Sequence, residues 1–153
     1  MLNLDNKIPP PLIATLCGAA MWGIALYTPG IEVAGALRIV GAVAVALAGV
    51  FFCTAGVVSF RRAQTTVNPL KPDAASALVR SGIYQVSRNP MYVGFALLLV
   101  SWAVFLSSPL ALLGVGVFML YINRFQIAPE ERALSMLFGA EFERYKNAVR
   151  RWI

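Results

Sequence analysis

The stretch Ser87-Arg88-Asn89-Pro90-Met91-Tyr92-Val93-Gly94 marks the point where a polar, basic loop meets a long apolar segment. Asn89 is a preferred residue for a helix N-cap, and Pro90 suits the first helical position, where no backbone donor is needed. The stretch therefore predicts a helix that starts at a membrane surface. The free N–H groups at such a start carry the positive end of the helix dipole and can receive an anionic group.

The composition is typical of an integral membrane protein. Of the 153 residues, 59% are hydrophobic and 13% are charged, whereas a soluble domain has roughly 25% charged residues. The short polar start before Pro9 lacks the pattern of a cleavable signal, so we expect the first apolar segment to stay as a span. The chain has no histidine, which excludes a Ser-His-Asp triad and a His-based zinc site. The two cysteines lie in apolar segments and indicate packing, so we expect no metal site.

Four apolar segments predict one all-α membrane domain over residues 1–153, with about four transmembrane helices. We expect the spans at approximately residues 12–28, 33–60, 90–106 and 109–125. Small residues in the second span would permit close helix packing; they are Gly35, Gly41, Gly49, Gly56, Ala42 and Ala46.

The region after the fourth span predicts a C-terminal cytoplasmic amphipathic helix. Residues 128–131 (APEE) are typical of a helix start, because the proline comes early and two acids occupy the first turn. Gly139 allows a break or a bend. Apolar residues follow the start at helical spacing; they are Leu134, Leu137, Phe138, Phe142, Tyr145, Val149 and Trp152. We expect this helix to lie against the bundle or the lipid headgroups.

The charge distribution predicts the orientation of the chain. The net charge is +6, and the basic residues gather in the long loop between the second and third spans and after the fourth span. The positive-inside rule then predicts that this loop and both termini are cytoplasmic, in an inner or plasma membrane. Basic residues that flank membrane segments favour membrane lipids as partners and disfavour nucleic acid.

The third and fourth spans bring together the polar residues that carry a candidate site. A turn of two or three residues joins these spans, so they are antiparallel neighbours and place Asn89 and Tyr92 at the same depth as Arg124. Glu130 and Glu131 follow shortly afterwards. Each residue alone has a plainer interpretation, such as an aromatic belt for Tyr92 or interfacial snorkelling for Arg124. Together they predict a site for a zwitterionic or amphiphilic ligand.

Several segments in a fixed order resemble the isoprenylcysteine carboxyl methyltransferase and phospholipid methyltransferase superfamily. They are residues 77–84 (ALVRSGIY), 88–94 (RNPMYVG), 129–132 (PEER), 138–145 (FGAEFERY) and 145–152 (YKNAVRRW). The resemblance covers residues 65–153, which would form a methyltransferase core. It implies a membrane enzyme that uses S-adenosylmethionine, releases S-adenosylhomocysteine, and takes a lipophilic substrate from the bilayer. The cofactor would lie on the cytoplasmic side without a Rossmann domain.

The resemblance also implies roles for individual residues. The cofactor would be bound by Leu78, Val79, Tyr84, Arg88, Asn89, Pro90, Met91, Tyr92, Gly94, Glu130 and Glu131. The catalytic group would comprise Arg124, as the cation that orients the substrate, together with Glu130, Glu131 and Tyr92.

The chain departs from the pattern at Asn89, where many members of the superfamily have histidine. Asparagine can cap a helix and donate a hydrogen bond, but it cannot act as a base. A carboxylate acceptor needs no base, so this departure slightly favours O-methylation of an isoprenylcysteine-like carboxylate. An amine acceptor would need deprotonation, for which Glu130, Glu131 and Tyr92 are available.

Two alternatives stay open at this point. One is N-methylation of a phospholipid amine, and the other is a non-enzymatic membrane protein that binds anionic lipids. A transporter is disfavoured, since no ionisable residue lies deep in an expected span. The sequence does not identify the acceptor, the oligomeric state, or which of Glu130 and Glu131 binds the cofactor.

Overall fold

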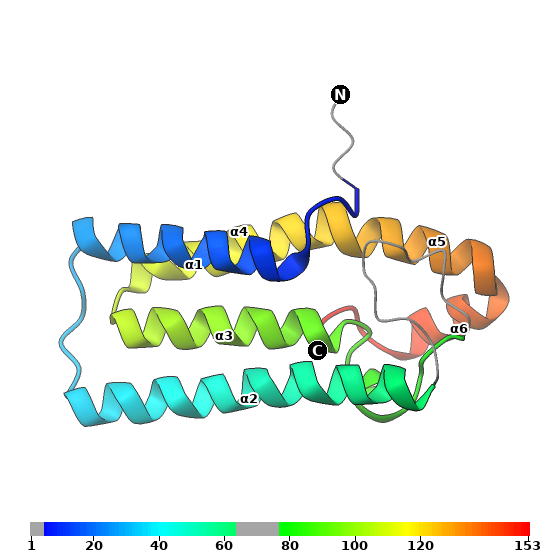
Figure 1. The fold of residues 1–153 in the computed structure, drawn as a ribbon, viewed down its shortest axis with the longest axis horizontal. Helices are drawn as coiled ribbons and strands as arrows, with labels where there is room; N and C mark the ends of the chain where they lie inside the picture. The colour runs from blue at the N-terminus through cyan, green and yellow to red at the C-terminus, as the bar shows by residue number, and fades with distance from the viewer. Residues whose placement is uncertain (1–4, 64–76) are drawn as a thin grey trace.

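The computed structural model describes residues 5–63 and 77–153, and within these ranges every regular element is a helix (Figure 1). This confirms the predicted all-α class; the expectations for residues 65–76 lie outside the described ranges. The elements are α1 (Pro10–Tyr27), α2 (Gly35–Arg62), η2 (Gly82–Gln85), α3 (Pro90–Leu106), η3 (Pro109–Ala111), α4 (Leu112–Ile122), η4 (Asn123–Ile127), α5 (Ala128–Phe138) and α6 (Ala140–Ala148).

The helices are those of an integral membrane protein. Three are long and apolar enough to cross a bilayer, namely α1, α2 and the continuous helix Pro109–Phe138, and α3 is a shorter apolar helix. The outer faces of α1 and α2 carry large apolar side chains that are more than half exposed; they include Leu16, Trp22, Leu47 and Phe51. Surfaces of this kind are covered by lipid in a membrane protein.

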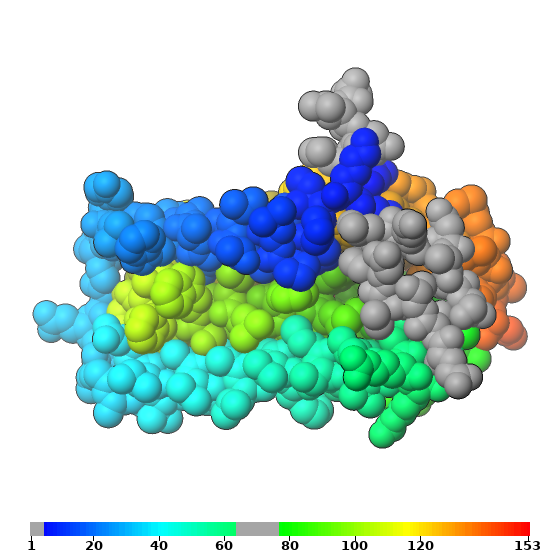
Figure 2. All heavy atoms as spheres, in the orientation of Figure 1, coloured from blue at the N-terminus to red at the C-terminus, as the bar shows by residue number. Residues whose placement is uncertain are grey.

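Helix α3 is the centre of the bundle. Figure 1 shows α3 between α2 on one side and α1 with α4 on the other, and Figure 2 shows the face on which α1 and α2 flank it. Side chains from α1, α3 and α4 form the buried core; they include Met21, Leu99, Val115 and Phe118. The indole of Trp102 donates to the Gly18 carbonyl at 3.0 Å, which ties α3 to α1.

Glycines allow α2 and α3 to pack closely. A Cβ built on Gly49 would lie 2.9 Å from the Gly94 carbonyl oxygen, and one on Gly94 would collide with Cys53 and the Gly49 carbonyl. A Cβ on Gly56 would lie 2.6 Å from Met91. The predicted packing role is therefore confirmed at Gly49 and Gly56, whereas a Cβ on Gly35 would have no neighbour within 4 Å in the described ranges.

The two tight turns of the bundle lie together at one end. The Ile31 N–H donates to the Ser107 carbonyl at 2.8 Å, so the turn between α1 and α2 is bonded to the turn between α3 and α4. In Figure 1, α5 and α6 lie at the opposite end, where α3 begins. The polar elements are thus collected at the end that holds the candidate site.

The fourth span does not end before α5. Helix α5 begins at Ala128, as expected, but the chain reaches it through the π turn η4 and not through a loop. In this turn the Ala128 N–H bonds to the carbonyl of Asn123, five residues earlier. Pro129 has no N–H and cannot bond to the Phe125 carbonyl, which instead accepts from the Asn6 N–H at 2.9 Å. The π turn therefore accommodates a proline inside a continuous helix.

The predicted break at Gly139 is confirmed. Gly139 has φ +49°, a left-handed value that favours glycine, and it separates α5 from α6. The expected C-terminal amphipathic helix is thus two short helices that fold back on each other (Figure 1). Val149 and Trp152 follow α6 in extended or irregular backbone, which corrects their assignment to the helical pattern.

Candidate functional site

The first turn of α3 and the first turn of α5 are joined by Tyr92 and Glu130. Tyr92 is 6% exposed, and its hydroxyl donates to Oε1 of Glu130 at 2.5 Å. A short bond from a phenol to a carboxylate is among the stronger hydrogen bonds in proteins. Tyr92 is therefore a buried partner of the acidic pair and not a member of an aromatic belt.

Glu131 lies between two arginines. Arg88 contacts Oε1 of Glu131 through Nη2 at 3.0 Å. Arg151 donates from Nε to Oε1 at 3.2 Å and from Nη2 to Oε2 at 2.6 Å. The side chains of Arg88 and Glu131 are only 10% and 18% exposed, so this ion pair is largely removed from water. Two guanidinium groups and one carboxylate leave one positive charge in excess.

Arg88 also carries donors without a partner. Its Nε and Nη1 are buried and have no hydrogen-bond partner among the described residues. A buried charged donor without a partner costs free energy. The arrangement therefore fits a ligand with an anionic group, which would complete the hydrogen bonding of Arg88.

Asn89 stands at the N-cap position of α3, but its side chain does not cap the helix, which corrects that prediction. The Asn89 Nδ2 donates to the Arg151 carbonyl at 2.8 Å. The Ser87 hydroxyl accepts from the Asn89 N–H at 3.1 Å. Pro90 occupies the first helical position, as expected. The amide of Asn89 thus holds the C-terminal segment, 62 residues away, against the start of α3.

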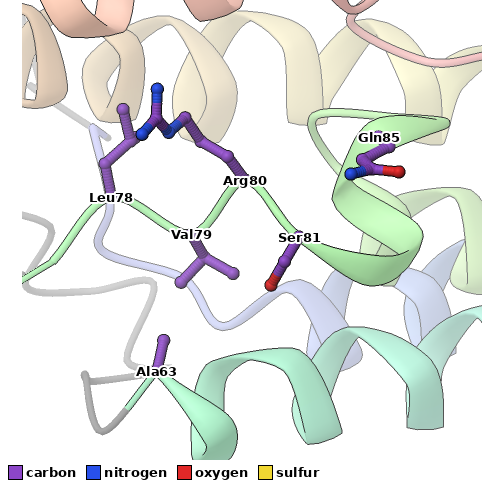
Figure 3. Close-up of a pocket in the computed structure, with 6 residues that line it drawn as sticks. All are labelled: Ala63, Leu78, Val79, Arg80, Ser81 and Gln85. Carbon is purple, nitrogen blue, oxygen red and sulfur yellow. The ribbon is translucent and has the colours of Figure 1, made fainter.

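A shallow pocket lies on the segment that leads into η2. It has a volume of about 390 Å³ and is lined by Ala63, Leu78, Val79, Arg80, Ser81 and Gln85 (Figure 3). Two of these residues, Leu78 and Val79, were expected to border a cofactor. Arg80 pairs with Glu141 of α6 at 2.9 Å, which connects the pocket to the C-terminal helices.

Tyr84 is buried between α2 and α6, close to the acidic pair. Its ring packs edge-on against Phe60, and its carbonyl accepts from the Tyr145 hydroxyl at 2.7 Å. Burial raises the pKa of Tyr84, and the nearby Tyr145 and Glu130 raise that pKa further. Tyr84 therefore stays neutral and supports the site by packing and by its carbonyl.

Three residues assigned to the site have other contacts. Arg124 is 64% exposed; it lies 3.6 Å from Asp5 and 5.2 Å from the Phe125 ring centroid. It shares no ion pair or hydrogen bond with Tyr92, Glu130 or Glu131 in the part of the chain that the structure describes. Asp5 also pairs with Arg132 at 2.7 Å.

Met91 and Gly94 lie against α2. The Met91 carbonyl accepts from the Cys53 thiol at 3.6 Å, and Gly94 meets Gly49 as described above. Gly94 thus allows α2 to approach α3 closely, whereas the resemblance implied that Gly94 allows the cofactor to approach.

Arg151 and Ser87 are site residues that the sequence did not reveal. Arg151 belongs to a segment that was recognised, 145–152, but no local pattern links its side chain to Glu131. The indole of Trp152 in the same segment donates to Oδ1 of Asn123 at 3.2 Å. The C-terminal segment therefore contacts both the start of α3 and the π turn.

Sequence comparisons relate the chain to a family of known proteins. Residues 36–141 match the family model for phospholipid methyltransferases. An uncharacterised protein of Haemophilus influenzae is 51% identical over 63 residues, which are 41% of this chain and the full length of that protein. No solved structure matches the chain.

Two curated enzymes are more distant relatives. The chain is 34% identical over 82 residues to the protein-S-isoprenylcysteine O-methyltransferase of Saccharomyces cerevisiae, and 36% identical over 72 residues to that of Dictyostelium discoideum. The matches cover 52% and 47% of this chain, but only 33% and 30% of those enzymes. Because the family model spans more than half of the chain and includes α3, the π turn and the Glu130–Glu131 pair, the chain belongs to the phospholipid methyltransferase family of membrane proteins.

Proposed function

We propose that this protein transfers a methyl group from S-adenosylmethionine to a lipophilic acceptor that reaches the site from the bilayer. Members of the family are S-adenosylmethionine-dependent methyltransferases. The observation that carries the proposal is Arg88, which has two buried donors without a partner in the described part of the chain, beside the Tyr92–Glu130 and Arg151–Glu131 contacts. The basic loop and both termini would lie in the cytoplasm.

The described residues fit the charges of the cofactor. Its carboxylate would complete the hydrogen bonding of Arg88, and its amino and sulfonium groups would be favoured near the carboxylate of Glu130. Leu78 and Val79 would supply an apolar surface in the neighbouring pocket. When bound, the cofactor supplies a methyl group on a sulfonium, ready for displacement.

Side chains of the protein would then hold the cofactor and Glu130 in place. Arg88 would hold one end of the cofactor, and Tyr92 would keep Glu130 oriented through its hydroxyl. The acceptor must align its nucleophile with the methyl carbon and the sulfur, and a site that fixes both partners can supply that alignment. The exposed apolar surface of the helices would deliver a lipid-soluble acceptor directly from the membrane.

O-methylation of an isoprenylcysteine-like carboxylate is the favoured reaction. Glu131 is committed to two guanidinium groups, and Asn89 cannot accept a proton as a base. A carboxylate acceptor is already ionised and needs neither residue as a base. The names of the yeast and Dictyostelium relatives, which are isoprenylcysteine O-methyltransferases, also support this choice.

N-methylation of a phospholipid amine is the second candidate, supported by the name of the family model. An ammonium headgroup must lose a proton before it attacks, and Glu130 is the carboxylate of the acidic pair that no arginine holds in an ion pair among the described residues. Glu130 would be the base of this reaction.

Methyl-labelled cofactor separates these functions. Membranes containing the protein would be incubated with N-acetyl-farnesylcysteine or with phosphatidylethanolamine vesicles, and the products identified by mass spectrometry. We expect a methyl ester of the farnesylcysteine, formed by the wild type and retained in part by Glu130→Gln. Labelled phosphatidylethanolamine that Glu130→Gln abolishes would support the amine reaction. No cofactor binding well above micromolar concentration would leave the non-enzymatic, lipid-binding alternative.

A further inference from the structure

Arg88 and Arg151 bind the Glu131 carboxylate in different ways. Arg151 takes both oxygens, through Nε to Oε1 and Nη2 to Oε2. Arg88 reaches only Oε1, through Nη2. Arg88 thus contacts one oxygen of Glu131, and Arg151 contacts both.

Arg88 also has donors that no described residue accepts. A guanidinium beside a lone carboxylate tends to form two parallel bonds, which would use a second nitrogen of Arg88. Here Arg151 holds Oε2 of Glu131, and Nε and Nη1 of Arg88 are buried and have no partner among the described residues. An anionic group that binds those donors would recover the cost of leaving them unpaired.

The backbone of Arg151 is fastened to the loop that carries Arg88. Asn89 Nδ2 and the Ser87 hydroxyl donate to the Arg151 carbonyl at 2.8 and 3.4 Å. The Arg88 N–H donates to the Arg150 carbonyl at 3.0 Å. These bonds place the Arg151 side chain relative to Arg88, so that one carboxylate can meet both.

We propose that Arg151 is a positioning residue that holds Glu131 and thereby keeps Arg88 open for the carboxylate of the cofactor. The inference rests on the proposed function. Arg151 acts through Glu131 and Arg88 and has no contact with the reacting atoms. Its loss would let Arg88 and Glu131 close on each other, and the affinity for the carboxylate end of the cofactor would fall.

Two ligands that differ in the amino-acid group test this role. The purified full chain in detergent would be titrated calorimetrically with S-adenosylhomocysteine, which has the carboxylate, and with 5′-methylthioadenosine, which lacks it. For Arg151→Gln we expect about 10- to 100-fold weaker binding of S-adenosylhomocysteine, the range for a lost hydrogen bond to a charged group. Binding of 5′-methylthioadenosine should stay unchanged, which also shows that the variant is folded.

Two further variants sharpen the test. Arg150→Gln removes the same charge from the neighbouring exposed side chain and should bind both ligands as the wild type does. Arg151→Lys keeps the charge but lacks the planar guanidinium that contacts both carboxylate oxygens, so it should recover only part of the affinity. In an Arg88→Gln background, Arg151→Gln should cause no further loss, because the effect passes through Arg88.

The inference fails if Arg151→Gln weakens both ligands equally, leaves S-adenosylhomocysteine unaffected, or adds its full effect to that of Arg88→Gln. Wild-type protein that binds neither ligand would overturn the proposed function itself, and the positioning role with it.

Discussion

The Tyr92 hydroxyl lies 2.5 Å from Oε1 of Glu130, and this contact ties the start of α3 to the start of α5. Glu131, the other acid of the pair, also links the two helices, because it binds Arg88 in the loop before α3. Adjacent carboxylates thus have separate partners. Glu130 meets a neutral donor, whereas Glu131 meets two cations.

Tyr92→Phe should weaken the site and the fold together. The ring is retained, but Glu130 loses its donor in a partly buried position, which we expect to cost about 1–3 kcal/mol of unfolding free energy. Thermal unfolding in detergent and the rate of methyl transfer would measure the change. Tyr121→Phe is the matched control, because the Tyr121 hydroxyl is buried without a partner among the described residues. Equal losses in the two variants would contradict the role of the Tyr92–Glu130 bond.

Gly94→Ala should destabilise the bundle by about 1–3 kcal/mol, the usual cost of overpacking. The new Cβ would meet Cys53 and the Gly49 carbonyl at the closest approach of α2 and α3. The unfolding temperature in detergent would measure the effect. Gly116→Ala is the control, since no atom of the described residues lies within 4 Å of a Cβ there. An unchanged unfolding temperature for Gly94→Ala would show that the helices separate at little cost.

Asn89→Ala should release the C-terminal segment. The variant loses the donor to the Arg151 carbonyl, so amide hydrogens of residues 149–152 should exchange faster in mass-spectrometric measurements. Asn89→His keeps a ring N–H donor and should retain part of the protection. If Asn89→Ala exchanged as slowly as the wild type, the side chain of residue 89 would not be what holds this segment.

The proposed orientation predicts which positions an impermeant thiol reagent can reach. In a background of Cys17→Ser and Cys53→Ser, Glu32→Cys should be labelled in intact cells. Arg150→Cys should be labelled only after the membrane is permeabilised, because the positive-inside rule places it in the cytoplasm. Labelling of the two positions in the reverse order would invert the orientation and move the site to the other face.

Much of the fold could be predicted because its signals are local. Apolar length indicates the spans, Pro90 indicates the start of α3, and Gly139 indicates the break between α5 and α6. Each of these depends on a few neighbouring residues and the rules of helix geometry.

The contacts of the site could not be predicted as well, because they are long-range. Arg88 and Arg124 each lie next to an apolar span, so the local sequence does not distinguish their contacts. Asp5 pairs with Arg124, and the C-terminal segment brings Arg151 to Glu131 and Arg88. Asn89 is a good cap by its type, but the Arg151 carbonyl takes its side chain. Neither outcome is visible in a window of adjacent residues.

The π turn before α5 makes the aim of the acidic pair a matter of counting residues. Such a turn holds one residue more than a regular helical turn, so everything beyond it is rotated by about 100° from the uninterrupted path. Deleting one residue from 123–127 would make the turn regular and leave both carboxylates aimed at Tyr92 and Arg88, whereas a regular turn that kept all five residues would direct them away. In this helix, the extra residue and the π turn belong together, because the carboxylates keep their aim only when both are present or both are absent.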